Sequence, residues 1–195
     1  MRGYFYLDIF FGIYYYISNR YIKMIYAYQK RDIKLEDKMN RAVIFFSLTN
    51  NTKEAAEYIA EKTGADLFQI ELAKPMPDSF EKQMLIGGMQ SSLGIIPKIK
   101  EVPMDIEKYD EIILGTPIWA GKASSPVNAL LKKYNVADKV TAVFTFSGGG
   151  DNDKCILAFG KVLKNMKANV ALADRKSDLS GSNQEKIDKF VAEIN

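Results

Sequence analysis

From residue 41 onward, short apolar runs alternate with longer segments in which apolar residues recur every three or four positions. The short runs have the length of β-strands, and the periodic segments have the pattern of helices that bury one face. The apolar runs predict five strands, at residues 42–47, 66–72, 111–115, 139–146 and 169–173. The periodic segments predict five helices, at residues 52–62, 79–89, 126–134, 153–165 and 184–194.

Strands that alternate with helices indicate an α/β fold, with a parallel sheet and helices on both of its faces. The first predicted strand reads AVIFFS and is apolar almost throughout, as expected of a parallel strand buried on both sides. A longer segment, residues 73–104, contains prolines near both of its ends. We expect this segment to be an excursion between two strands that carries one helix and covers the sheet.

Residues 1–38 differ from the rest of the chain in composition. They hold 11 of the 23 aromatic residues, with seven basic and four acidic residues, which leaves 20 of each charge in residues 39–195. The change predicts an N-terminal extension, residues 1–38, followed by a single domain, residues 39–195. Because that domain is formally neutral, the net charge of +3 does not indicate a nucleic-acid-binding surface, and we expect no nucleic-acid partner.

The extension begins with a 14-residue aromatic and apolar run, residues 4–17, which Asp8 and Gly12 interrupt. The run is shorter than the roughly 20 apolar residues of a transmembrane helix, and it lacks the pattern of a secretory signal. Three interpretations remain open: an artefactual extension with the true start at Met39, an anchor at a membrane interface, or a folded cap. Membrane contact is therefore expected only if the extension belongs to the native protein.

Two residue counts restrict the chemistry. The chain has no histidine, which excludes Ser–His and Cys–His nucleophile pairs and histidine-ligated zinc sites. Cys155 is the only cysteine, so the chain cannot form an internal disulfide, and we expect a cytoplasmic protein. Reactive chemistry must then come from a cofactor, from carboxylates or from the backbone, and we expect no metal.

Ligands of open parallel sheets bind at the carboxyl ends of the strands, so the loops that follow the predicted strands carry the candidate site. The loop after the first strand is rich in hydroxyl and amide side chains, and it leads into a helix whose free N–H groups could hold a phosphate. Simple capping of that helix is the competing interpretation. The loop after the third strand contains the only tryptophan, which could stack on a flat ring. Three glycines in the loop after the fourth strand would let the backbone approach a ligand closely.

The candidate binding residues belong to these three loops. They are Ser47, Thr49, Asn50, Asn51 and Thr52 in the first loop, Thr116, Pro117, Ile118, Trp119, Ala120 and Gly121 in the second, and Ser147, Gly148, Gly149 and Gly150 in the third.

Several motifs in these loops resemble the flavodoxin-like family of FMN-binding proteins. The first loop is similar to the family's phosphate loop, [ST]-x-T-G-x-T, with Asn50 in the place of the glycine, and asparagine tolerates a left-handed backbone better than most residues. The sequences GTPIWAGKASSPV at residues 115–127 and TFSGGG at residues 145–150 are similar to its two flavin loops, and DLSG at residues 178–181 is similar to one branch of the family. The resemblance covers residues 41–195. It implies a doubly wound, five-stranded parallel sheet in the order 2-1-3-4-5, with FMN as the cofactor.

The resemblance also implies a function, an FMN-binding protein that carries electrons between redox partners, which would be proteins or small-molecule donors and acceptors. The third loop lacks the tyrosine that flavodoxins place against the outer face of the flavin. An open flavin face would admit a hydride donor or an organic substrate, so an NAD(P)H-dependent flavin or quinone oxidoreductase is a second hypothesis. A module that binds a phosphorylated ligand without catalysis is a third.

Overall fold

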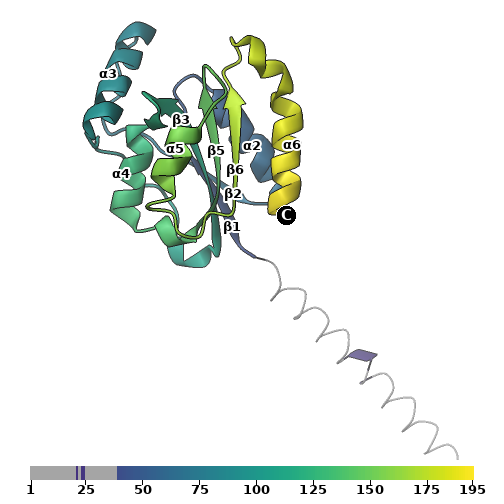
Figure 1. Ribbon diagram of the computed structural model, residues 1–195. Coiled ribbons are helices and arrows are strands. Elements are labelled where there is room, and N and C mark those ends of the chain that lie inside the picture. The colour runs from purple at the N-terminus through teal and green to yellow at the C-terminus, as the bar shows by residue number, and fades with distance from the viewer. Residues whose placement is uncertain (1–20, 22, 25–38) are drawn as a thin grey trace, which may run out of the picture. The chain divides into compact units, whose positions relative to one another are not determined.

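A computed structural model of the chain describes residues 21, 23, 24 and 39–195 (Figure 1). The chain divides into two units, Met1–Met39 and Asn40–Asn195. Apart from Tyr21, Lys23 and Met24, the predicted extension lies outside the described residues, so its three interpretations stay open. In the part of the chain that the structure describes, no helix has the length and apolar character needed to cross a membrane.

The second unit contains the predicted parallel sheet. Its parallel strands are β1 (Arg41–Phe45), β2 (Asp66–Gln69), β3 (Glu111–Trp119), β5 (Val140–Ser147) and β6 (Ala168–Ala173). They lie in the order β2-β1-β3-β5-β6, which is the predicted order of the five parallel strands. A short strand, β4 (Lys122–Ala123), is added in antiparallel pairing to the end of β3. The doubly wound fold is confirmed, with β4 as an addition.

Helices cover both faces of the sheet (Figure 1). On one face, α2 (Asn51–Thr63) and α6 (Asn183–Ile194) pack on alternate strand residues such as Val43 and Phe45. On the other face, α4 (Ser125–Tyr134) and α5 (Asp153–Phe159) pack on the intervening residues, such as Ile44. Single-turn helices lie at Ile106–Lys108 and Ala137–Lys139, with a slightly longer one at Asp178–Ser182. The two faces alternate because successive side chains of a strand point to opposite sides of the sheet.

The excursion between β2 and β3 is closed at its base. Strand β2 ends at Gln69, earlier than predicted, and Leu72 then forms an antiparallel bridge with Ile99. The backbone N–H of Ala73 donates to the carbonyl of Lys98 at 2.9 Å. Between these ends lies α3 (Phe80–Leu93), which is capped by Ser79 and runs four residues beyond the predicted end at residue 89. The excursion is therefore an anchored arm, and α3 contacts β3, β4 and α4.

Two other predicted element ends are wrong for a physical reason. Strand β3 continues to Trp119 rather than ending at residue 115, because Thr116 and Pro117 pair with β5 and the next two residues pair with β4. Helix α5 ends at Phe159 rather than at residue 165, because the chain then tightens into turns, with the N–H of Val162 bonding to the carbonyl of Phe159.

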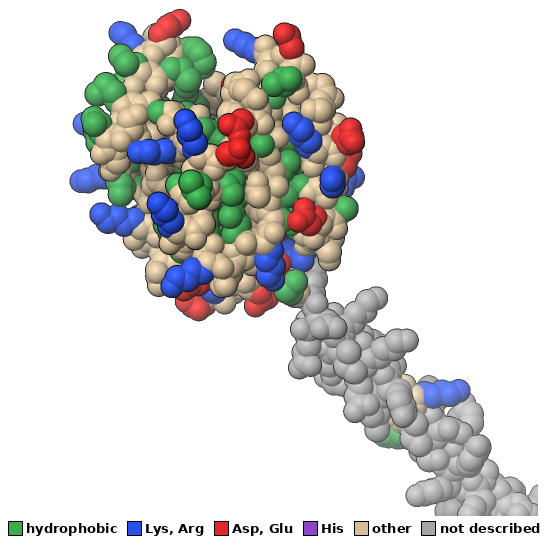
Figure 2. Space-filling model, in the orientation of Figure 1, with side chains coloured by type: hydrophobic (Ala, Val, Ile, Leu, Met, Phe, Trp, Pro, Cys, Tyr) green, Lys and Arg blue, Asp and Glu red, His purple; other side chains and the backbone are tan. Residues whose placement is uncertain are grey.

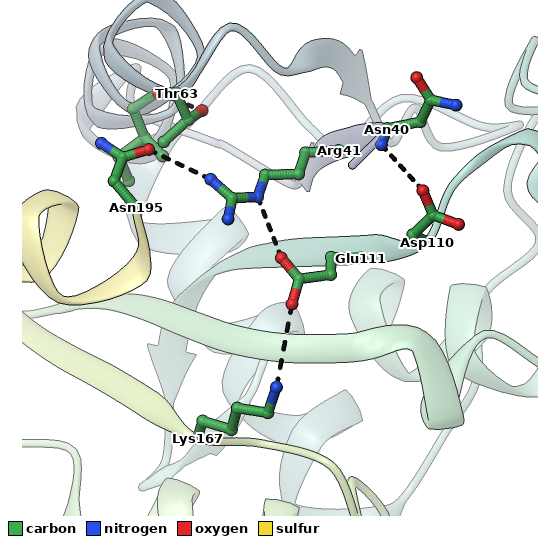
Figure 3. Close-up of polar contacts among 8 residues, drawn as sticks. Asn40, Arg41, Thr63, Asp110, Glu111, Lys167 and Asn195 are labelled. Atoms are coloured by element: carbon green, nitrogen blue, oxygen red, sulfur yellow. Dashed lines mark hydrogen bonds and ion pairs between the residues drawn. The ribbon is translucent and has the colours of Figure 1, made fainter. Parts of the chain in front are cut away.

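A polar cluster ties the amino ends of the strands together (Figure 3). Arg41 of β1 donates from Nε to Glu111 Oε2 at 3.0 Å, and from Nη1 to Asn195 Oδ1 at 3.1 Å. Lys167, just before β6, lies 4.0 Å from Glu111 Oε1. These contacts join β1, β3, the start of β6 and the end of α6 at one edge of the sheet. The opposite edge, where the strands end, carries the loops of the candidate site.

Candidate functional site

The loop after β1 turns into α2 through a left-handed residue. Asn50 has φ of 66°, the conformation in which asparagine is better tolerated than most residues. Among the described side chains, none caps the N-terminus of α2. The helix therefore directs its first N–H groups toward the loop without a side-chain acceptor, and such groups attract anions.

The hydroxyl of Ser47 lies in the same loop. Among the described residues, its Oγ is the one buried side-chain polar atom without a hydrogen-bond partner. A buried polar group without a partner costs free energy, which a ligand oxygen bonded to it would recover. An unpartnered hydroxyl in the loop that leads to an uncapped helix N-terminus fits a phosphate group.

The loop after β3 is a β-hairpin. The backbone reverses between β3 and β4 through Ala120, with φ of 51°, and Gly121, with φ of 74°. Two consecutive residues with positive φ are typical of the tight turn that joins antiparallel strands. At the base of the hairpin, the fully buried Thr116 hydroxyl accepts from the N–H of Ser124 at 3.0 Å and lies 3.1 Å from the Ser124 hydroxyl. Thr116 thus joins the hairpin to the start of α4.

Trp119 is the last residue of β3 rather than part of a free loop, and its side chain is only 5% exposed. Its ring meets Phe46 edge to face, with the centroids 5.6 Å apart. On α3, Gly87 lies so close to the indole that a Cβ placed there would be 2.9 Å from Trp119 Cε3. The indole is therefore packed between the sheet and α3, and its stacking on a ligand ring stays a prediction.

The loop after β5 is a turn closed by Ser147. The Ser147 hydroxyl accepts from the N–H of Asp151 and donates to the carbonyl of the same residue, both at 3.0 Å. The carbonyl of Ser147 accepts from the N–H of Gly150, which has φ of 65°, and from the N–H of Asp174 at 2.9 Å. The turn is thereby tied to the end of β6.

A cavity of about 250 Å³ lies where these loops meet. Figure 2 shows a hollow at this edge of the domain, between α3 and the loop that precedes α6. Eight predicted residues line the cavity: Thr49, Asn51, Thr52, Pro117, Ile118, Trp119, Ser147 and Gly148. Seven predicted residues do not line it: Ser47, Asn50, Thr116, Ala120, Gly121, Gly149 and Gly150. Ser47 and Asn50 belong to the same loop as three lining residues, whereas the Thr116 hydroxyl is committed to Ser124.

The cavity lining also contains five residues that were not predicted from the sequence: Leu48, Phe80, Met84, Phe146 and Asp174. Asp174 directly follows β6, and inspection of the loop after the last strand would have found it. Phe80 and Met84 come from α3, in the arm between β2 and β3. Nothing in their local sequence indicates that the arm folds over this edge.

Asp174 is the one charged side chain among the described residues that line the cavity. Its carboxylate accepts from the Asn51 side-chain amide, which also donates to Thr49 Oγ1 at 3.3 Å. Within the described part of the chain, no lysine or arginine belongs to the cavity wall. An anion in this cavity would be held by backbone N–H groups and hydroxyls, with a carboxylate as neighbour. Among the described residues, no group of three histidine, cysteine or acidic side chains could hold a metal ion.

Two other cavities lie on the flanks of the sheet. One, of about 360 Å³ between α4 and α5, contains Cys155, whose pKa burial raises to about 12. A thiol with such a pKa stays protonated and unreactive near neutral pH. The other, of about 430 Å³ between α2 and α6, contains Glu54 and Arg175, which form an ion pair. The DLSG motif borders this second cavity rather than the one at the carboxyl edge.

Comparison with known proteins agrees with this arrangement. The family model described as flavodoxin matches residues 40–194, which covers the α/β unit almost completely. No curated protein matches the chain by sequence.

Three solved structures with the same fold match this chain over nearly their whole length. A candidate flavoprotein from Bacteroides eggerthii is 24% identical, with a TM-score of 0.61 over 77% of this chain and 97% of that one. A flavoprotein from Lactobacillus acidophilus, in complex with FMN, is 21% identical, with a TM-score of 0.59 over 78% and 98%. A WrbA-like flavodoxin from Agrobacterium tumefaciens is 20% identical, with a TM-score of 0.50 over 80% and 94%.

Proposed function

Because this chain belongs to the flavodoxin family, we propose that it binds FMN at the carboxyl edge of its sheet and carries electrons between redox partners. When bound, FMN supplies the redox chemistry, because its ring system accepts electrons from a donor and passes them to an acceptor. The chain itself binds and orients the cofactor. The partners we propose are redox proteins or small-molecule donors and acceptors.

The phosphate of FMN would bind the loop between β1 and α2. Ser47 offers a buried hydroxyl without a partner, and the uncapped N-terminus of α2 offers backbone N–H groups. The Thr49 and Thr52 side chains, which line the adjoining cavity, add further hydroxyls. This arrangement holds an anion without lysine or arginine, and it is the observation that carries the proposal.

The flavin ring would lie in the cavity between the β3–β4 hairpin and the turn after β5. Pro117, Ile118 and Trp119 form an apolar wall on one side. Gly148, without a side chain, lets the backbone approach the ring from the β5 turn. The cavity of about 250 Å³ is slightly below the usual range for ligand sites, so part of the cofactor would face solvent, where a partner can reach it.

The ionisable groups of the cavity support electron carriage rather than acid–base catalysis. Asp174 is the one ionisable side chain among the described lining residues, and it accepts a hydrogen bond from Asn51. General acid–base catalysis usually places a titratable side chain within reach of the substrate, with its pKa near the working pH. Electron transfer through a bound flavin needs no such group.

The test uses the full chain. The protein is mixed with FMN or with riboflavin, unbound flavin is removed, and the visible absorption and the dissociation constant are measured. We expect FMN to be retained more tightly than riboflavin, because riboflavin lacks the phosphate. Ser47→Ala should raise the Kd for FMN roughly tenfold and leave the Kd for riboflavin unchanged, since a hydrogen bond to a charged group contributes about 1.5–3 kcal/mol. Ser92→Ala, at an exposed position on α3, is the matched control.

The same preparation separates the alternative functions. A carrier should need a separate reductase to become reduced, whereas an oxidoreductase would oxidise NADH or NADPH by itself, with a quinone or free flavin as acceptor. Folded protein that binds inorganic phosphate but retains no FMN would contradict the proposal and favour a module for phosphorylated ligands.

A further inference from the structure

The aromatic side chains of the cavity differ in the surface that they offer to a ligand. Among the described lining residues, three are aromatic: Trp119 is 5% exposed, Phe146 is 8% exposed and Phe80 is 51% exposed. A flavin ring stacks on the accessible face of an aromatic side chain, and an aromatic ring that is already buried by protein contacts offers little accessible face. Phe80 is therefore the aromatic residue of the cavity lining with the most accessible surface.

Contacts with other residues of the chain explain why the indole of Trp119 is buried. Gly87 lies against its indole, and Phe46 meets the ring at an interplanar angle of 84°. To expose a face of Trp119, α3 would have to lift from β3 and lose these contacts. Phe80 would bind a ring without such a loss, because its exposed surface becomes buried when the ligand arrives.

The backbone of Phe80 is well held even though its side chain is exposed. Phe80 is the first residue of α3, and the preceding Ser79 accepts from the N–H of Lys82 at 3.5 Å. The Gln83 side chain donates to the carbonyl of Pro77 at 2.7 Å, which fixes the chain on the other side of the cap. Phe80 therefore projects from an ordered helix start into the cavity wall.

The ring of Phe80 also contacts Lys176, which does not itself line the cavity. The Lys176 ammonium lies 5.9 Å from the ring centroid, and Lys176 belongs to the turn just after β6. A cation at this distance is attracted to the face of an aromatic ring. The contact links the start of α3 to the turn after β6, which begins with Asp174, another residue of the cavity lining.

We propose that Phe80 is the side chain that stacks on the flavin ring, and that Trp119 acts as a packed wall rather than as the stacking residue. The inference rests on the proposed function, because it needs FMN in this cavity. It also supplies an aromatic contact from the arm between β2 and β3, whereas the turn after β5, residues 147–152, contains no aromatic residue.

The experiment titrates FMN into the full chain and into four variants, following flavin fluorescence and the visible circular dichroism of the bound ring. Phe80→Ala should raise the Kd for FMN roughly tenfold and reduce the quenching of flavin fluorescence, since removing a stacked aromatic ring weakens binding of a flat ring. Phe80→Trp should restore both. Leu85→Ala changes an apolar side chain that is 65% exposed on the same helix and should leave both unchanged. Trp119→Phe keeps an aromatic ring in the wall and should change the Kd by less than about threefold.

Each outcome decides the proposal. Wild-type affinity and quenching in Phe80→Ala would overturn it, as would a larger loss in Trp119→Phe than in Phe80→Ala. Thermal melting of each variant confirms that it is folded. If the wild-type chain itself retains no FMN, the proposed function fails and this inference fails with it, whereas binding by the wild type with no effect at Phe80 refutes the inference alone.

Discussion

Gly87 of α3 lies directly against the indole of Trp119 at the end of β3, and a Cβ at Gly87 would come within 2.9 Å of Cε3. This contact joins the arm between β2 and β3 to the edge of the sheet where the candidate site lies. It requires a residue without a side chain, because the indole is buried and also packs against Phe46. The position of α3, and with it the position of Phe80, depends on this close approach.

Gly87→Ala should therefore lower the free energy of unfolding, whereas Gly88→Ala should raise it. A Cβ at Gly88 would meet nothing within 4 Å, so alanine there gains helix propensity of up to about 1 kcal/mol. At Gly87 the same gain is opposed by overpacking, which costs roughly 1–3 kcal/mol. Urea unfolding of both variants measures the difference, and equal stabilities would contradict the close packing of α3 on Trp119.

Asn50 should tolerate glycine but not alanine. Its φ of 66° is left-handed, which costs an ordinary L-residue roughly 1–2 kcal/mol and costs glycine almost nothing. We expect Asn50→Ala to lower the free energy of unfolding by about 1 kcal/mol and Asn50→Gly to leave it unchanged or raise it. Chemical denaturation measures both. If the alanine variant is as stable as the glycine variant, the result would contradict the left-handed conformation of Asn50.

Asp174→Asn should tighten the binding of FMN. Asn51 donates a hydrogen bond to this carboxylate, and the amide of the variant can still accept it. Removal of a negative charge near a bound phosphate should lower the Kd about fivefold at low salt, which corresponds to roughly 1 kcal/mol. Riboflavin binding should change less, and added salt should shrink the effect. Asp178→Asn, away from the cavity lining, is the control, and an equal effect in both variants would exclude a local role for Asp174.

The ion pair between Arg41 and Glu111 should contribute more to stability than the exposed pair between Lys100 and Glu71. The Arg41 and Glu111 side chains are 12% and 16% exposed, against 60% and 56% for Lys100 and Glu71. Removing one partner of a largely buried pair leaves the other charge without compensation. We expect Glu111→Gln to lower the free energy of unfolding by about 2 kcal/mol and Glu71→Gln by less than about 1 kcal/mol. Similar losses in both would show that burial of the cluster in Figure 3 has no energetic effect.

Tyr109 should make the domain sensitive to alkaline pH. Burial, together with a hydrogen bond of 2.7 Å from its hydroxyl to Asp66 Oδ2, raises the pKa of Tyr109 to about 12. The unfolded chain releases this proton near the ordinary pKa of about 10, so deprotonation favours unfolding as the pH rises above 10. Between pH 8 and pH 11, the wild type should lose more stability than Tyr109→Phe. Equal losses in the two proteins would show that Tyr109 titrates normally.

The sequence alone identified the elements whose pattern is local. The apolar run of β1 and the periodicity of α2 follow from the residues that each element contains, because burial of one face or both faces imposes its own spacing. The left-handed turn at Asn50 also follows locally, since few residue types accept that backbone conformation. For these reasons the parallel sheet and the loop between β1 and α2 were predictable from their own residues.

Contacts between distant segments were decided only by the tertiary structure. Nothing near Phe80 or Met84 indicates that α3 folds over the carboxyl edge of the sheet, and nothing near Trp119 indicates that Gly87 packs on its ring. The predicted end of β3 at residue 115 is also wrong, because Thr116 and Pro117 are strand residues through their pairing with β5 and not through their own preference. Which residues line the cavity depends on how the arm between β2 and β3 packs against the sheet, and packing between segments leaves no periodic signal in either of them.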